Sequence, residues 1–252
     1  MLKPADKLAV ARRFGAAAAQ YDASARVQAR IAQAMADRLA ALALPPAARV
    51  LEIGCGTGLL TAAALARLPG VGAWLASDIA PAMAGACRAR LGGDPRLMAA
   101  AMDGEVPAVT GPFDLICSSL ALQWFPDAGA ALARWRGLLR PGGVLCVATL
   151  GAGTFSEWRA ALAMAGAPAA GPAYPDAATL AGWLGPQGRA ERQGFVEHHP
   201  DARHFLLSLR GIGADYAPGR LSAPVLRRAM RALEAAGPVG VTYDVCWLTV
   251  RG

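Results

Sequence analysis

The 252-residue sequence has no apolar run that approaches the roughly 20 residues needed to cross a bilayer. Its first seven residues, Met1 to Lys7, lack the apolar centre of a secretory signal. Five cysteines, an odd number scattered along the chain, fit buried thiols in a reducing cytoplasm better than a disulfide framework or a metal site. These absences predict a cytoplasmic protein with no membrane segment and no bound metal.

Charge is distributed unevenly along the chain. The formal net charge is +7, with +5 in residues 1–49, −1 in residues 50–188 and +3 in residues 189–252. Basic flanks can steer an acidic partner towards a cleft and raise its association rate. Alternatively, the arginines only keep an alanine-rich chain soluble. The sequence has no known nucleic-acid-binding module and no interleaving of basic and aromatic residues, so we expect no nucleic acid partner.

A glycine-rich turn stands between a predicted strand and a predicted helix. The run Val50–Ile53 is apolar apart from Glu52, and Gly54-Cys55-Gly56-Thr57-Gly58 separates it from the helical residues Leu59–Leu65. Glycines let the backbone approach a ligand closely, and the helix N-terminus offers free N–H groups. A dinucleotide-binding GxGxxG would need glycine at position 59, which is leucine. The alternative interpretation is a tight turn without a ligand.

Two acidic segments follow this turn. Asp78 ends the short apolar stretch Gly72–Ser77, 20 residues after Gly58. A carboxylate at this distance, at the tip of the neighbouring strand, can accept hydrogen bonds from both ribose hydroxyls of a nucleoside. The second acidic segment is Asp103-Gly104-Glu105. The pattern therefore predicts a nucleoside-binding site.

Short apolar segments alternate with helical patterns, which predicts an α/β fold with a doubly wound, mostly parallel sheet. Strands are predicted at 113–119, 189–199 and 241–250, with a turn at 140–143 before the fifth strand. Helices are predicted at 81–90, 201–212 and 222–236. We expect one domain over residues 1–252. Within it, residues 1–45 form a helical segment of a cap, 46–150 the ligand-binding core, and 151–252 the rest of the sheet with a helical cap insertion at about 200–237.

The glycine motif with its downstream acids resembles the first motifs of class I methyltransferases, which bind S-adenosylmethionine. This resemblance implies a seven-stranded, Rossmann-like sheet and places Asp103 beside the adenine amino group. The cofactor contacts that it implies are Glu52, Gly54, Cys55, Gly56, Gly58, Asp78, Ile79, Asp103, Gly104, Ser118 and Ser119.

Other segments make the resemblance more specific: Phe14–Asp22, the Ser119–Trp124 run, Leu209–Ala214 and Val241–Tyr243. Over nearly the whole chain, they resemble the malonyl-acyl-carrier-protein O-methyltransferases of biotin synthesis. The resemblance implies methylation of the free carboxyl of a malonyl thioester on an acyl carrier protein. Arg210 would orient the substrate carboxylate and Tyr21 would close the pocket, with Gln123 and Trp124 beside them. Relatives often carry lysine where Arg210 stands, so the charge is kept but its geometry is not.

This chemistry agrees with what the sequence lacks. A carboxylate is already ionised near pH 7 and needs no general base, and the first 197 residues contain no histidine. No Asn-Pro-Pro-Tyr follows the fourth predicted strand, which disfavours methylation of nucleic-acid bases. No acidic triad suggests a metal-dependent catechol enzyme.

Two alternative functions stay open at this point. One is methylation of a different small acid, such as a tricarboxylate. The other is a methyltransferase-like assembly factor for a respiratory complex, which binds a protein partner and need not transfer methyl groups. The candidate residues also have structural interpretations: Tyr21 as a packed phenol, Gln123 and Trp124 as a helix-start amide and a core aromatic, and Arg210 as a partner of a helix C-terminus.

Overall fold

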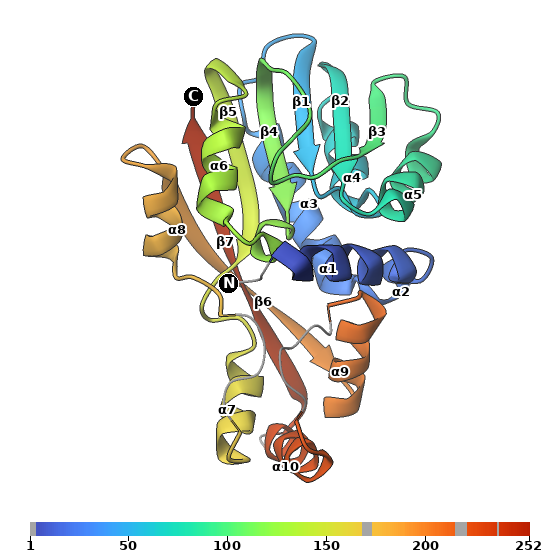
Figure 1. The fold of residues 1–252 in the computed structure, drawn as a ribbon, viewed down its shortest axis with the longest axis vertical. Helices are drawn as coiled ribbons and strands as arrows, with labels where there is room; N and C mark the ends of the chain where they lie inside the picture. The colour runs from blue at the N-terminus through green and yellow to red at the C-terminus, as the bar shows by residue number, and fades with distance from the viewer. Residues whose placement is uncertain (1–3, 168–172, 215–220, 236) are drawn as a thin grey trace.

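The computed structural model describes residues 4–167, 173–214, 221–235 and 237–252. At its centre is a seven-stranded sheet with the order β3-β2-β1-β4-β5-β7-β6 (Figure 1). Strands β1 to β5 are parallel, and β7 is antiparallel to both of its neighbours. The predicted α/β fold with a mostly parallel sheet is confirmed. The strands are β1 (Ala48–Ile53), β2 (Val71–Asp78), β3 (Leu97–Ala101), β4 (Phe113–Ser119), β5 (Leu139–Leu150), β6 (Arg189–His199) and β7 (Val239–Arg251).

Helices cover both faces of the sheet because neighbouring strand residues point to opposite faces. Val50 and Leu115 pack with α3 and α4 on one face, and Leu51 and Ile116 pack with α6 and α8 on the other. None of the helices within the described ranges is both long and apolar enough to cross a membrane. The helices are α1 (Pro4–Ala17), α2 (Tyr21–Ser24), α3 (Arg26–Ala40), α4 (Leu59–Arg67), α5 (Pro81–Leu91), the short 3₁₀ turn η1 (Leu122–Trp124), α6 (Ala128–Arg136), α7 (Ser156–Met164), α8 (Ala177–Leu184), α9 (Ala202–Gly211) and α10 (Ala223–Glu234).

The strand order reverses between β1 and β4. After β1 the chain continues to β2 and β3 on one side, and it returns to β4 on the other side. Ligands of doubly wound folds bind outside the carboxyl ends of the strands at such a reversal. The segments that leave β1 and β4 touch each other there, because a Cβ at Gly54 would lie 2.2 Å from the Cβ of Ala121.

Strands β6 and β7 extend beyond the rest of the sheet (Figure 1). Residues 239–244 of β7 pair with β6 alone, and α7, α9 and α10 lie around this extension. Of the two helices of the predicted insertion, α9 contacts α2, whereas α10 packs against α7 at the far tip. The insertion therefore reaches the N-terminal helices through α9. Residues 215–220 and Ala236, which also belong to the predicted insertion, lie outside the described residues, as do residues 1–3 of the predicted N-terminal segment.

One predicted turn takes a different form. Residues 140–143 lie inside β5, not before it. The pairing of β4 with β5 passes from Phe113–Leu139 to Leu115–Val144, so these four residues are bulged out of register, with Gly142 at a φ of 76°. The Pro-Gly-Gly pattern here marks a bulge within a strand.

Candidate active site

A pocket lies at the carboxyl ends of the central strands, and it encloses about 710 Å³ of space that includes some open solvent. The sheet side supplies residues that directly follow β1, β2, β3 and β4. The N-terminal helices α1 and α2 supply the opposite wall. The lining includes Ile53, Gly54, Gly56, Asp78, Ile79, Asp103, Gly104, Ser119 and Leu120 from the sheet side, and Lys7, Val10, Phe14 and Tyr21 from the helices. We call this space the first pocket.

The three glycines of the turn after β1 all have positive φ, at 75°, 54° and 87°. A Cβ at Gly58 would lie 2.9 Å from Cys87 Sγ, and one at Gly54 would collide with Ala121, so these two glycines permit close packing. A Cβ at Gly56 would meet no atom within 4 Å, and Gly56 lines the first pocket. Of these three glycines, Gly56 is therefore the one beside open space.

Asp78 is held at the edge of the first pocket by backbone N–H groups. Its Oδ2 accepts a hydrogen bond from Gly56 N at 3.0 Å, and its Oδ1 accepts one from Ala80 N at 2.8 Å. Burial raises the pKa of Asp78, and the two N–H groups act in the opposite direction. Each oxygen keeps a further lone pair, so Asp78 is held in a fixed position and can accept further hydrogen bonds.

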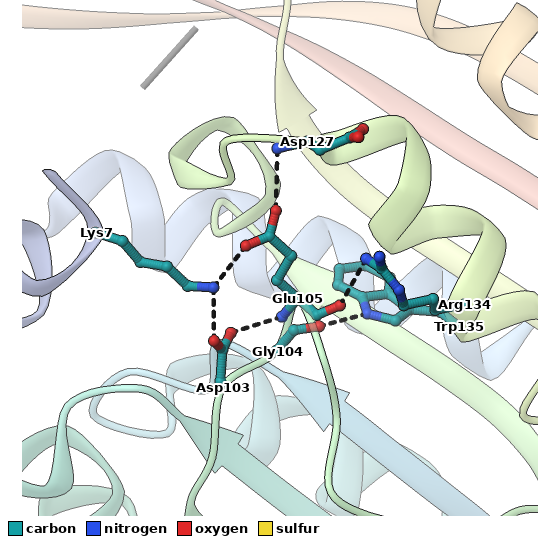
Figure 2. A network of polar contacts seen from close by, with 7 residues as sticks. All are labelled: Lys7, Asp103, Gly104, Glu105, Asp127, Arg134 and Trp135. Atoms are coloured by element: carbon teal, nitrogen blue, oxygen red, sulfur yellow. Dashed lines mark hydrogen bonds and ion pairs between the residues drawn. The ribbon is translucent and has the colours of Figure 1, made fainter. Parts of the chain in front are cut away.

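Figure 2 shows how α1 is tied to the segment after β3. Lys7 Nζ lies 2.6 Å from Asp103 Oδ2 and 2.6 Å from Glu105 Oε2. Asp103 Oδ1 also accepts the Glu105 N–H, and the Trp135 indole N–H donates to Gly104 O. Burial lowers the pKa of Lys7, but the two carboxylates outweigh this and raise it. The ammonium is therefore charged and closes the first pocket at this end.

Sequence reasoning missed the contribution of α1 before Phe14. Lys7, Val10 and Phe14 line the first pocket, and they are three and four residues apart. This spacing places them on one face of a helix. The spacing is a signal that the sequence contains, but it cannot say which surface the face covers.

A second pocket of about 370 Å³ adjoins the glycine turn and is lined in part by Glu52, Cys55 and Gln28. Glu52 Oε2 accepts hydrogen bonds from Thr61 Oγ1 at 2.7 Å and from Trp74 Nε1 at 2.8 Å. Burial raises the pKa of Glu52 to about 8 in spite of these two donors. The second pocket thus contains a buried carboxyl group that a cation would stabilise in its charged form.

A third pocket of about 470 Å³ lies between η1, α9 and β7. It shares Phe14, Tyr21, Leu120 and Trp124 with the first pocket, so the two spaces adjoin. Its lining is mostly apolar, with phenols at Tyr21, Tyr174 and Tyr243. Burial raises the pKa of all three phenols, so they stay protonated.

Gln123 and Trp124 both line the third pocket. The amide of Gln123 is used at both ends, because its Nε2 donates to Leu120 O at 2.7 Å and its Oε1 accepts from Thr149 Oγ1 at 3.2 Å. Gln123 therefore fixes the η1 turn. Trp124 packs edge-on against Phe14 with ring centroids 5.3 Å apart, which joins η1 to α1.

Like Gly58, two further predicted site residues, Ser118 and Arg210, line none of the three pockets. Ser118 is fully buried, and it is its neighbour Ser119 that lines the first and second pockets, because adjacent strand residues point in opposite directions. Arg210 is exposed in the last turn of α9, whereas Leu209 and Ile212 line the third pocket. The predicted contact of Arg210 with the substrate carboxylate stays a prediction.

Comparison with known proteins assigns the chain to a family. Residues 51–145 match the family model described as a methyltransferase domain. The chain is 46% identical over 251 residues to the biotin biosynthesis bifunctional protein BioCD of Bordetella avium, covering 96% of this chain and 53% of the relative. It is 41% identical over 246 residues to the malonyl-[acyl-carrier protein] O-methyltransferase of Magnetococcus marinus, covering 94% of this chain and 90% of the relative. The chain belongs to the malonyl-[acyl-carrier protein] O-methyltransferase family.

The predicted methyltransferase is thereby confirmed. A solved structure, the YcgJ protein of Bacillus subtilis, matches with a TM-score of 0.62 and covers 86% of this chain and 97% of that one. At 15% identity it supports the fold alone. The chain spans about half the length of the bifunctional relative. Within the described ranges, no group of three or more His, Cys, Asp or Glu residues could hold a metal ion.

Proposed function

We propose that this methyltransferase transfers a methyl group from S-adenosylmethionine to the free carboxyl of a malonyl thioester on an acyl carrier protein. The observation that carries the proposal is the 41% identity to the Magnetococcus marinus enzyme over 90% of that enzyme's length. The geometry of the three adjoining pockets supports it, since they can separate a nucleoside, its amino-acid part and an acceptor.

The residues of the first two pockets fit S-adenosylmethionine. The open space at Gly56 admits a ligand against the backbone, and Asp78 offers fixed acceptors for the ribose hydroxyls. Asp103 and Gly104, which Lys7 and Trp135 hold in place, line the end of the first pocket assigned to the adenine. The second pocket, which contains Glu52, takes the methionine part.

S-adenosylmethionine supplies an electrophilic methyl carbon on a positively charged sulfur. A lone pair of the substrate carboxylate forms the new O–C bond, and the electrons of the C–S bond pass to sulfur. No proton has to be removed, because the carboxylate is ionised near pH 7. The enzyme therefore mainly has to align the two groups, which can contribute roughly 7–11 kcal/mol in favourable intramolecular cases.

The third pocket suits such a reaction. The positive and negative charges of the reactants cancel in the transition state, so a largely apolar pocket favours it over the separated ions. Protonated phenols such as Tyr21 and Tyr174 can donate to the substrate without forming an ion pair that would stabilise the ground state. We further propose that the exposed Arg210 side chain turns towards Leu209 and Ile212 when the substrate binds and contacts its carboxylate.

The carrier protein is proposed to dock on α9, whose Leu209 lines the third pocket, and on α10 at the far tip. Helices α9 and α10 carry the exposed Arg203, Arg227 and Arg231, which can attract an acidic surface. All five cysteines are unpaired and buried, which supports a reducing cytoplasm as the compartment.

The proposal is tested by transfer of a labelled methyl group to four acceptors: malonyl-carrier protein, malonyl-coenzyme A, free malonate and a tricarboxylate. We expect transfer to the malonyl thioesters, with the carrier-bound form preferred. Transfer to free acids alone would favour a small-acid methyltransferase. Cofactor binding without methylation of any carboxylate would favour the assembly-factor alternative.

Asp78→Ala provides the internal control for this assay. Loss of its hydrogen bonds should weaken S-adenosylmethionine binding by about 1.5–3 kcal/mol, the range for bonds to a charged group. Labelled transfer should fall in parallel when the cofactor is below saturation. Calorimetry that finds unchanged cofactor affinity would show that Asp78 does not hold the ribose.

A further inference from the structure

Gln28 is a polar residue on the buried face of α3. The other buried residues of that helix are Val27, Ile31, Ala32, Met35, Ala36 and Leu39. Gln28 is only 8% exposed, and among the described residues its Oε1 has no hydrogen-bond partner. Leaving a buried carbonyl oxygen unpaired costs stability. Where such an oxygen borders a pocket, a ligand that brings the missing donor can pair it.

The position of Gln28 indicates which ligand this is. Gln28 lines both the second and the third pocket, as do Tyr21 and Leu120. It therefore lies at the junction between the space that contains Glu52 and the space assigned to the acceptor. This junction is where the methionine part of the donor must end and the substrate must begin.

The charges in the second pocket indicate which group of the ligand pairs with Gln28 Oε1. Its described lining contains the carboxyl group of Glu52 and the unpaired Gln28 Oε1, and no lysine or arginine. Glu52 receives hydrogen bonds from Thr61 and Trp74, both of them neutral donors. Two acceptors without a cation favour a ligand group that is positively charged and donates several hydrogen bonds. A carboxylate, such as that of the malonyl group, brings no donor.

We propose that Gln28 is a positioning residue for the methyl donor, whose α-ammonium donates a hydrogen bond to Gln28 Oε1. This inference rests on the proposed use of S-adenosylmethionine and adds a contact from α3 to those from the sheet. The contact orients the methionine chain at the junction with the third pocket.

Calorimetric binding of two ligands tests this contact. The ligands are S-adenosylhomocysteine and its deamino analogue, in which hydrogen replaces the α-amino group. Gln28→Leu removes the amide at similar volume. Gln33→Leu is the matched control on the exposed face of the same helix, where Gln33 Oε1 accepts a hydrogen bond from Arg67 Nη2. We expect Gln28→Leu to weaken S-adenosylhomocysteine binding about tenfold. It should leave binding of the deamino analogue unchanged, and Gln33→Leu should alter neither.

Thermal unfolding provides a second readout that does not depend on activity. Without ligand, Gln28→Leu should melt at a higher temperature than the wild type, because an unpaired buried polar group is replaced by an apolar one. The increase in melting temperature on adding S-adenosylhomocysteine should be smaller in the variant. A lower melting temperature without ligand would mean that the amide is satisfied within the protein, which would overturn the proposal.

Other binding results would contradict the proposed contact between Gln28 and the α-ammonium. Equal weakening of both ligands by Gln28→Leu would show a structural role, and unchanged binding of S-adenosylhomocysteine would show no contact. If the loss instead disappears with the decarboxylated analogue, the amide meets the carboxylate and the proposed contact is wrong. Failure of the wild type to bind S-adenosylhomocysteine at all would overturn the proposed function together with this inference.

Discussion

Gly56 differs from Gly54 and Gly58 in the space around it: a Cβ at Gly56 would meet no atom within 4 Å. Gly54 and Gly58 are packed against Ala121 and Cys87, whereas the space beside Gly56 is open and belongs to the first pocket. Single residues of one motif therefore have different physical roles. The motif as a whole is easy to find in the sequence, but this division of roles requires the structure.

Gly56→Val should abolish cofactor binding in a protein that still folds. The branched side chain would occupy the space beside the backbone, and the positive φ would cost about 1–2 kcal/mol of stability. The matched control is Gly142→Val in the β5 bulge, where φ is 76° and a Cβ also meets nothing within 4 Å. We expect similar losses of stability but lost binding in Gly56→Val alone. Normal calorimetric binding by a folded Gly56→Val protein would exclude the turn as the cofactor site.

Glu52 makes the stability of the ligand-free protein depend on pH. Its folded-state pKa is raised from 4.5 to about 8, so the folded state holds a proton that the unfolded state has released between these values. The stabilisation that the protonated Glu52 gives to the folded state is complete below about pH 4.5. It is lost as the pH rises through about 8. We expect Glu52→Gln to reduce the fall in unfolding free energy over this range, by up to about 1.4 kcal/mol per pH unit. Identical pH profiles from denaturant titrations would contradict a neutral Glu52.

At the scale of elements, α1 acts as the outer wall of the first pocket. Its attachment rests on Lys7 with Asp103 and Glu105, and on the packing of Phe14 against Trp124. These contacts join a helix near the N-terminus to segments about one hundred residues later. Closing such a wall excludes water and slows the departure of a bound ligand.

Lys7→Met should therefore speed the release of S-adenosylhomocysteine. The side chains of Lys7 and Glu105 are each only 15% exposed, so their pairing is worth more than that of a surface ion pair. We expect the dissociation rate to rise about tenfold, the lower end of the range for hydrogen bonds between charged groups. Arg12→Met, at an exposed position of α1, is the control. Equal rates in wild type and Lys7→Met, measured by stopped-flow, would mean that α1 does not gate the pocket.

The sequence predicts well those features that depend on local patterns. The glycine turn, Asp78 at the end of β2 and the Pro81 start of α5 all follow from residue types at fixed spacing. Long-range placement is harder, because periodicity shows that a face is buried but not what it covers. Sequence reasoning missed Lys7 in the wall of the first pocket and the buried Gln28, whose Oε1 is unpaired among the described residues, for this reason.

The direction in which neighbouring side chains point explains why two predicted site residues, Ser118 and Arg210, do not line the pockets. One position along β4 separates the buried Ser118 from Ser119 in the pocket. One position along α9 turns the side chain by about 100°, which separates Arg210 at the surface from Leu209 at the third pocket. A motif that covers both neighbours cannot distinguish them.

At the scale of the whole molecule, the basic flanks are proposed to attract the carrier protein. Catalytic efficiency on malonyl-carrier protein should fall steeply with salt, because exposed charges are screened within about 8–10 Å near physiological ionic strength. Turnover of a small malonyl thioester should change much less. Arg227→Glu with Arg231→Glu reverses two charges that lie four residues apart on α10. This pair should slow association with the carrier protein and leave the affinity for the cofactor intact.

The control for this experiment is an equal change of charge elsewhere. Arg189→Glu with Arg251→Glu alters two exposed arginines at the other end of β6 and β7. We expect this pair to leave the carrier-dependent rate almost unchanged. Equal salt sensitivity for both substrates, or equal effects of the two charge reversals, would exclude docking on α10.

We propose that this methyltransferase esterifies the free carboxyl of a carrier-bound malonyl group. The most direct test of this proposal is the mass of malonyl-carrier protein after incubation with the enzyme and S-adenosylmethionine, followed by fragmentation of the released acyl chain. We expect one added methyl group per carrier, located on the terminal carboxyl with the thioester intact. An unchanged carrier mass, or a methyl group on the carrier polypeptide itself, would contradict the proposal.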